Sequence, residues 1–174
     1  MSINTTMEHN YDIKETIFNA VKSKKQREGD KGLLPVFDSS QFPTINVTFS
    51  TMLDRPAFDC FLKQWLDCYS QKEDFTFIFN MQNIKWVSPS YSLIVIKFMK
   101  QLRKHIRELP YLKTSIMIIN SNFIRGLLYR VFQIQAPISH VYLVSSKEEA
   151  EKIAQGDEIA KKYSVNIPPN TLLK

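Results

Sequence analysis

The order of hydrophobic and polar residues predicts a chain in which strands alternate with helices. Ile45, Val47 and Phe49 alternate with polar residues, as in a strand with one solvent-exposed face. Residues 75–79 are apolar except for one threonine, as in a strand covered on both faces. With two further apolar runs, the predicted strands are 45–49, 75–79, 115–119 and 141–144. Apolar residues at helical spacing predict helices at 56–70, 89–109, 122–134 and 147–155.

This alternation predicts an α/β fold with a mainly parallel sheet and flanking helices, because parallel strands need long crossover connections. The expected organisation is an N-terminal extension at 1–40, a single domain at 41–156 and an irregular tail at 157–174. Within the extension we expect a short amphipathic helix at 12–24, a basic linker at 22–31, and no more than an edge segment at 33–37. The expected core includes Phe77, Phe98, Leu102, Ile118 and Leu128.

The composition is typical of a globular protein, with 44% hydrophobic and 23% charged residues in a chain of 174. The first residues lack the basic start and apolar run of a signal peptide, and no apolar run approaches the ~18 residues that span a bilayer. We therefore expect a cytoplasmic protein. Cys60 and Cys68 lie on one predicted helix, roughly 12 Å apart along its axis. This separation is too long for a disulfide, so free thiols are expected.

Motifs for catalysis, cofactors or metals are scarce. The four glycines do not form a phosphate-binding loop, and the three histidines and two cysteines do not form a zinc motif. His105 falls on the core face of the predicted helix 89–109, where an imidazole commonly packs and bonds a carbonyl. A lone histidine has neither a nucleophile nor an orienting partner. We therefore expect no enzymatic activity, no cofactor and no metal site.

The turn Ser88-Pro89-Ser90 joins the predicted strand 75–79 to the predicted helix 89–109. Ser88 suits the N-cap position and Pro89 suits the first helical position, so the turn is interpreted as a helix cap. Ser90 falls in the first turn, whose N–H groups have no partner within the helix. Phosphorylation of Ser88 or Ser90 is the alternative interpretation.

The helix that follows this turn carries two aliphatic residues, Leu93 and Ile96, among basic residues opposite its core face. Such a face is more apolar than solubility requires, so either a partner or the segment 12–24 of the same chain should cover it. The candidate phosphorylation and interaction residues are Ser88, Ser90, Ser92, Leu93, Ile96, Lys97 and Lys100.

Several short sequence motifs, taken in their order along the chain, point to a known family. They are Phe77-Ile78-Phe79 with Asn80, then Ile84 and Trp86-Val87, then Ile116 to Asn120, then Phe123-Ile124-Arg125 with Leu127-Leu128 and Phe132, and finally Val141 to Val144 with Glu148-Glu149-Ala150. Over residues 45–155 this sequence of phrases resembles the STAS domain family. The family includes antagonists of anti-sigma factors and the cytoplasmic tails of anion transporters.

The resemblance implies a STAS-like fold and a non-catalytic regulatory or scaffold module that binds another protein, such as a kinase or a regulatory partner. The chain departs from the family at its functional residues. Ser88 stands where the family has an aspartate, Pro89 stands at the phosphoacceptor, and Tyr91 replaces a glycine. The family's phospho-switch therefore cannot be carried over onto Pro89, and Ser88 or Ser90 would hold it after a shift of one residue.

Two other functions stay open. The stretch from Tyr111-Leu112-Lys113 to Ile118-Ile119-Asn120 is similar to a phrase of the lipid-binding CRAL-TRIO domains, although the chain lacks length for their gate helix and cavity walls. A net charge of +6, with basic residues in the linker and on the helix 89–109, suits a binder of nucleic acid or anionic membrane. Solvated basic faces are the favoured interpretation of that charge.

Overall fold

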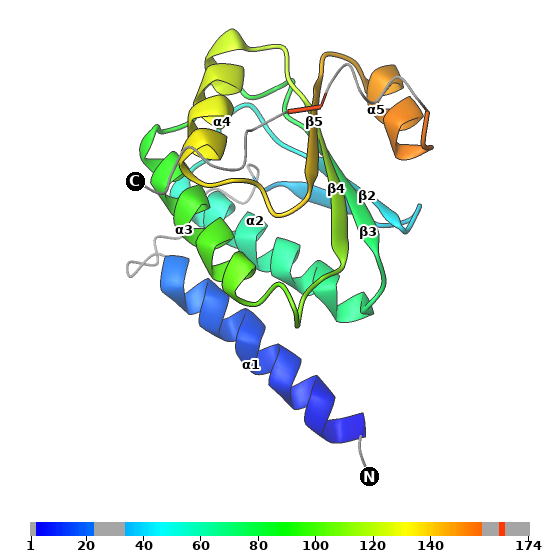
Figure 1. Cartoon of the computed structure of the whole chain (residues 1–174). Helices are drawn as coiled ribbons and strands as arrows, with labels where there is room; N and C mark the ends of the chain where they lie inside the picture. Colours follow the sequence, from blue (N-terminus) through cyan, green and yellow to red (C-terminus); the bar gives the residue numbers. More distant parts are fainter. Residues whose placement is uncertain (1–2, 23–33, 158–163, 166–174) are drawn as a thin grey trace.

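The computed structural model confirms the predicted fold class, a single α/β domain in which helices flank a mostly parallel sheet (Figure 1). It describes residues 3–22, 34–157 and 164–165, without the side chains of residues 3–11. The strands in these ranges are β1 (Val36–Asp38), β2 (Thr44–Thr48), β3 (Phe75–Asn80), β4 (Leu112–Ile118) and β5 (His140–Val144). The helices there are α1 (Ile3–Val21), α2 (Arg55–Cys68), α3 (Ser90–Lys104), α4 (Asn122–Ile134) and α5 (Lys147–Ala154), and the short 3-10 helix η2 (Tyr69–Gln71) follows α2.

The strands lie side by side in their order along the chain, with β1 antiparallel to β2 and every later pair parallel. Each crossover therefore adds the next parallel strand on the same side of the preceding one. Because such crossovers have one hand, their helices lie on the same face of the sheet. Figure 1 shows α2, α3 and α4 on that face and α5 on the other. The loops that lead from β2, β3 and β4 into these helices consequently all begin at the carboxyl ends of the parallel strands.

The larger core lies between the sheet and α2–α4, and it is rich in aromatic rings. The rings of Phe77 and Phe79 on β3 have centroids 4.9 Å apart, and the Trp65 ring lies 5.3 Å from both Phe77 and Phe98. The opposite side of β3 contributes Ile78 to a smaller core under α5. The strand at 75–79 is thus covered on both faces, as its apolar sequence predicts.

Four of the five residues expected in the core are buried: Phe77, Phe98, Leu102 and Ile118. The prediction for Leu128 is wrong, because this side chain is only half-buried. Leu128 borders a cavity beside α3 instead of packing fully against the sheet. Phe123, another apolar residue of the predicted helix 122–134, is 53% exposed.

The predicted helix 89–109 is too long, because α3 ends at Lys104. The His105 N–H then bonds the Leu102 carbonyl at 3.1 Å, and the chain turns toward β4. Pro110 disfavours helical backbone at Leu109, the residue before it. Leu109 is nevertheless only 2% exposed. The pattern of buried apolar residues therefore continues past the end of α3, which is why it predicted too long a helix.

Helix α1 begins well before the amphipathic helix predicted at 12–24 and ends at Val21. Its buried side chains are Ile13, Ile17 and Val21, and they belong to the same core as those of α2 and α3. Figure 1 shows α1 along the outer side of these two helices. Part of the N-terminal extension therefore packs on the domain, and β1, from the predicted edge segment, pairs with β2 at the sheet edge.

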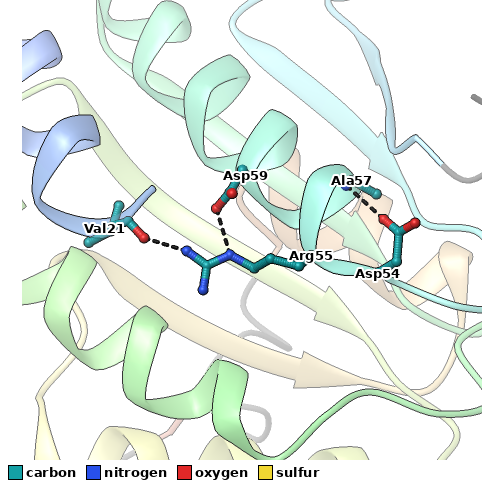
Figure 2. A network of polar contacts seen from close by, with 5 residues as sticks. All are labelled: Val21, Asp54, Arg55, Ala57 and Asp59. Carbon is teal, nitrogen blue, oxygen red and sulfur yellow. Dashed lines mark hydrogen bonds and ion pairs between the residues drawn. The ribbon is translucent and has the colours of Figure 1, made fainter. Parts of the chain in front are cut away.

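Arg55, at the start of α2, forms a hydrogen bond to the last residue of α1 (Figure 2). Its guanidinium donates to the Val21 carbonyl, and its Nε donates to Asp59 Oδ1 at 2.9 Å. The last carbonyls of a helix have no partner within it, so Arg55 satisfies a group that α1 leaves open. The neighbouring Asp54 caps α2 by accepting a hydrogen bond from the Ala57 N–H at 2.8 Å.

Two predicted segments lie largely outside the described residues. They are the basic linker beyond Lys22 and most of the tail after residue 157. Of that tail, the Val165 N–H bonds the Val141 carbonyl at 3.0 Å, so a short piece pairs with the outer edge of β5.

Candidate functional site

The candidate site is the turn from β3 into α3, which residues 81–89 form at the carboxyl edge of the parallel strands. The turn is held against the loop after β2, since the Lys85 N–H donates to the Thr51 carbonyl at 2.9 Å and Met52 forms a parallel bridge with Trp86. Ile84 anchors the turn in the core at 4% exposure. The adjacent Trp86 points outward instead and is 55% exposed.

The predicted side-chain cap by Ser88 is wrong. Ser88 Oγ lies 2.8 Å from Ser90 Oγ, so the two hydroxyls bond each other and neither caps a backbone N–H. The first turn is instead closed by the Ser88 carbonyl, which accepts from the Tyr91 N–H at 3.0 Å. Pro89 has helical backbone angles (φ −56°, ψ −25°), as expected for a proline at a helix start. The caps of α4 and α5, by Ser121 and Ser146, do have the side-chain bond.

The seven candidate residues fall into three groups. Ser90, Leu93, Lys97 and Lys100 are exposed, and Leu93 is 68% exposed. Ser88 and Ser92 are half-buried, and the Ser92 hydroxyl donates back to the Pro89 carbonyl. Ile96 is 7% exposed and lies in the core that α1 shares with α3. The sequence left open whether a partner or the same chain covers Leu93 and Ile96. The same chain covers Ile96, whereas Leu93 stays on the surface.

The basic residues of α3 are not equivalent. The Arg103 guanidinium donates to the carbonyls of Ala136 and Pro137, each at 2.9 Å, and so joins the end of α3 to the loop before β5. Arg103 therefore has a structural role. Lys97 and Lys100 are exposed on the same helix, and neither is bonded in this way to any residue that the structure describes.

An apolar cavity of about 110 Å³ lies under the turn, between the sheet and α2, α3 and α4. Phe49, Phe79 and Met117 line it from the sheet side, and Phe61 and Trp65 line it from α2. The surface that these residues present to the cavity is almost entirely apolar. No pattern in the sequence predicted this cavity, because the residues around it are those of an ordinary core.

Tyr91 stands between this cavity and the start of α2. Its ring stacks on the ring of Phe58, with centroids 4.8 Å apart and planes 15° apart. Burial raises the pKa of the Tyr91 hydroxyl, and the Asp54 carboxylate adds to the rise. The phenol is therefore neutral at physiological pH.

A second hollow, of about 510 Å³, lies on the opposite face of the sheet beside α5. It follows from the alternation on β2, whose Ile45 and Val47 point into the core while Thr44, Asn46 and Thr48 line the hollow. Because these residues are polar, this part of the sheet does not require a covering helix.

Groups suited to metal binding or thiol chemistry are few. Within residues 12–22, 34–157 and 164–165, no three His, Cys, Asp or Glu side chains stand where they could hold a metal ion. Cys60 and Cys68 are free and half-buried, as expected. Burial raises the pKa of the Cys68 thiol to about 12, and this thiol donates to the Gln64 carbonyl at 3.2 Å. His105 is half-buried at the end of α3.

No family model, curated protein or solved structure matched this chain. The STAS resemblance accordingly rests on the sequence phrases and on the order of the elements. No helix in the described ranges is long and apolar enough to cross a bilayer.

Proposed function

We propose that this chain is a non-catalytic regulatory or scaffold module of the STAS type that binds another protein at the turn into α3. The observation that supports the proposal is the exposure of two large apolar side chains around this turn, Trp86 at 55% and Leu93 at 68%. Trp86 and Leu93 lie seven residues apart on either side of the helix start, and contiguous exposed apolar side chains mark protein-binding surfaces. We call Trp86, Ser90 and Leu93 the turn surface.

Ser90 gives this surface a possible means of regulation by a kinase. Its side chain is exposed, and the first turn of α3 contains no acidic residue. A phosphate there would add about −1.5 to −2 charges at the positive end of a helix, which the fold should tolerate. A partner seated on Trp86 and Leu93 would have to desolvate that charge, so phosphorylation should weaken its binding.

The test compares three variants of the full chain as bait for proteins of its source cells, with the captured proteins quantified by mass spectrometry. Trp86→Asp and Leu93→Asp each place a charge on the turn surface. Val36→Asp is the matched control, because Val36 is 64% exposed but lies on β1. We expect one set of proteins to be lost at least about ten-fold with both turn variants and retained with the control. Capture that survives both turn variants would remove the turn surface from consideration.

Regulation at Ser90 is tested separately with Ser90→Glu. This variant should melt at nearly the wild-type temperature, since negative charge in a first helical turn stabilises by about 0.3–1 kcal/mol. It should also capture less of the protein set that depends on Trp86 and Leu93. Equal capture by Ser90→Glu and by wild type would mean that Ser90 is not a switch, while leaving the turn surface itself in place.

A further inference from the structure

The cavity under the turn has the form of a small binding site. Its lining is contributed by the sheet, by the loops after β2 and β3, and by three helices. Its volume of about 110 Å³ approaches the ~150 Å³ of an apolar protein cavity that stays dry and takes up benzene. An apolar group that enters it would remove its own surface and that of the lining from water, which favours binding.

The entrance lies between α3 and α4. The lining residues that remain half-buried are Met81, Val87, Tyr91, Ser92 and Val95 on the side of the turn and α3, and Leu127 and Leu128 on α4. The opposite wall, with Phe79 and Met117, is buried. The cavity therefore opens to solvent between the start of α3 and the middle of α4. The incomplete burial of Leu128, which its apolar spacing did not predict, is explained by this position.

We infer that this cavity binds the apolar part of a small molecule, a single aromatic ring or a short branched aliphatic group. The volume admits one such group and excludes a long acyl chain. The aromatic lining suits a ring, since Phe49, Phe61 and Trp65 all line the cavity and aromatic pairs gain energy beyond their buried area. A polar end of the ligand would emerge into solvent between the start of α3 and the middle of α4. The site is distinct from the turn surface, because neither Trp86 nor Leu93 lines the cavity.

Toluene is a suitable probe, and Trp65 is a built-in reporter because it lines the cavity. The other tryptophan is removed with Trp86→Phe, so that all indole emission comes from Trp65. We expect toluene to shift this emission with a single saturable isotherm and to raise the melting temperature. Palmitate should not displace it, because its chain exceeds the volume of the cavity.

Filling the cavity should abolish this response. Val95→Phe and Leu128→Phe each add a ring at the entrance, from opposite helices, and each should weaken toluene binding at least ten-fold. Arg130→Phe is the matched control on α4, because Arg130 is exposed and outside the lining. It should bind toluene as wild type does. The two filling variants are independent, so one that fails to fold leaves the other to decide.

Three results would each overturn the inference. The first is the absence of any saturable change up to the aqueous solubility of toluene. The second is wild-type affinity in a folded Val95→Phe or Leu128→Phe variant, which would place toluene elsewhere. The third is displacement of toluene by palmitate at lower concentration, which would assign the site to long-chain lipids. None of these outcomes depends on whether the turn surface binds a protein.

Discussion

Replacing Ile17 by alanine tests whether α1 is an integral part of the domain. Ile17 is fully buried, with 0% exposure, in the core that α1 shares with α2 and α3. Truncating a buried isoleucine to alanine typically costs about 2–5 kcal/mol, through lost burial and the cavity left behind. Because α1 packs on the outside of the domain and can settle inward, we expect the lower half of this range (Figure 1).

The measurement is urea unfolding followed by circular dichroism, with the midpoint and slope fitted for each variant. Thr16→Ala is the control, because Thr16 is an exposed neighbour on the same helix. If α1 unfolds with the domain, Ile17→Ala should lower the midpoint and leave the slope unchanged. A loss below about 0.5 kcal/mol, the range of ordinary surface substitutions, would refute the conclusion that α1 belongs to the core.

Four further predictions concern the side chains of Phe98, Ser88 and Cys68. Phe98→Ala should cost about 3–5 kcal/mol in urea unfolding, because Phe98 is completely buried against Trp65. Ser88→Ala should cost clearly less than the ~1 kcal/mol of a lost helix cap, because the Ser88 hydroxyl bonds only the Ser90 side chain. In a Cys60→Ser background at pH 8, iodoacetamide should alkylate Cys68 at least ten-fold more slowly in the folded than in the unfolded protein. Burial raises the pKa of this thiol from 9.0 to about 12, and the thiolate is the nucleophile. The same shift should reduce stability as pH rises from about 9 toward 12, because the unfolded thiol ionises first, and Cys68→Ser should flatten that decline.

The sheet and its crossover helices could be predicted because burial imposes a local period on the sequence. On β2 the alternation of Ile45 and Val47 with polar residues reproduces which side chains face the core. On β3 the unbroken apolar run reproduces burial on both faces. Such patterns depend only on which direction each side chain points.

Other features depend on contacts between distant segments, and the sequence does not encode them locally. Leu109 is as buried as a helical core residue, so its hydrophobicity alone could not show where α3 ends. Ser88 and Pro89 have the residue types of a helix start, but the Ser88 hydroxyl bonds Ser90 and not the backbone. The cavity at the turn is likewise invisible in the sequence, because it depends on how far α4 stands from α3.

The arrangement of α3 limits how a partner could reach this helix. Phe98 and Leu102 are buried in the core, and Ile96 is buried on the side where α1 packs. A partner that binds apolar side chains on this side of α3 must therefore use Leu93 in the exposed first turn or displace α1 to reach Ile96. Displacement would subtract the stability of the α1 contact from the binding energy. Weakening that contact with Ile17→Ala should then tighten partner binding, by about ten-fold for each 1.4 kcal/mol lost from α1 docking. Binding at the turn surface predicts the opposite result, an affinity unchanged by Ile17→Ala and abolished by Leu93→Asp.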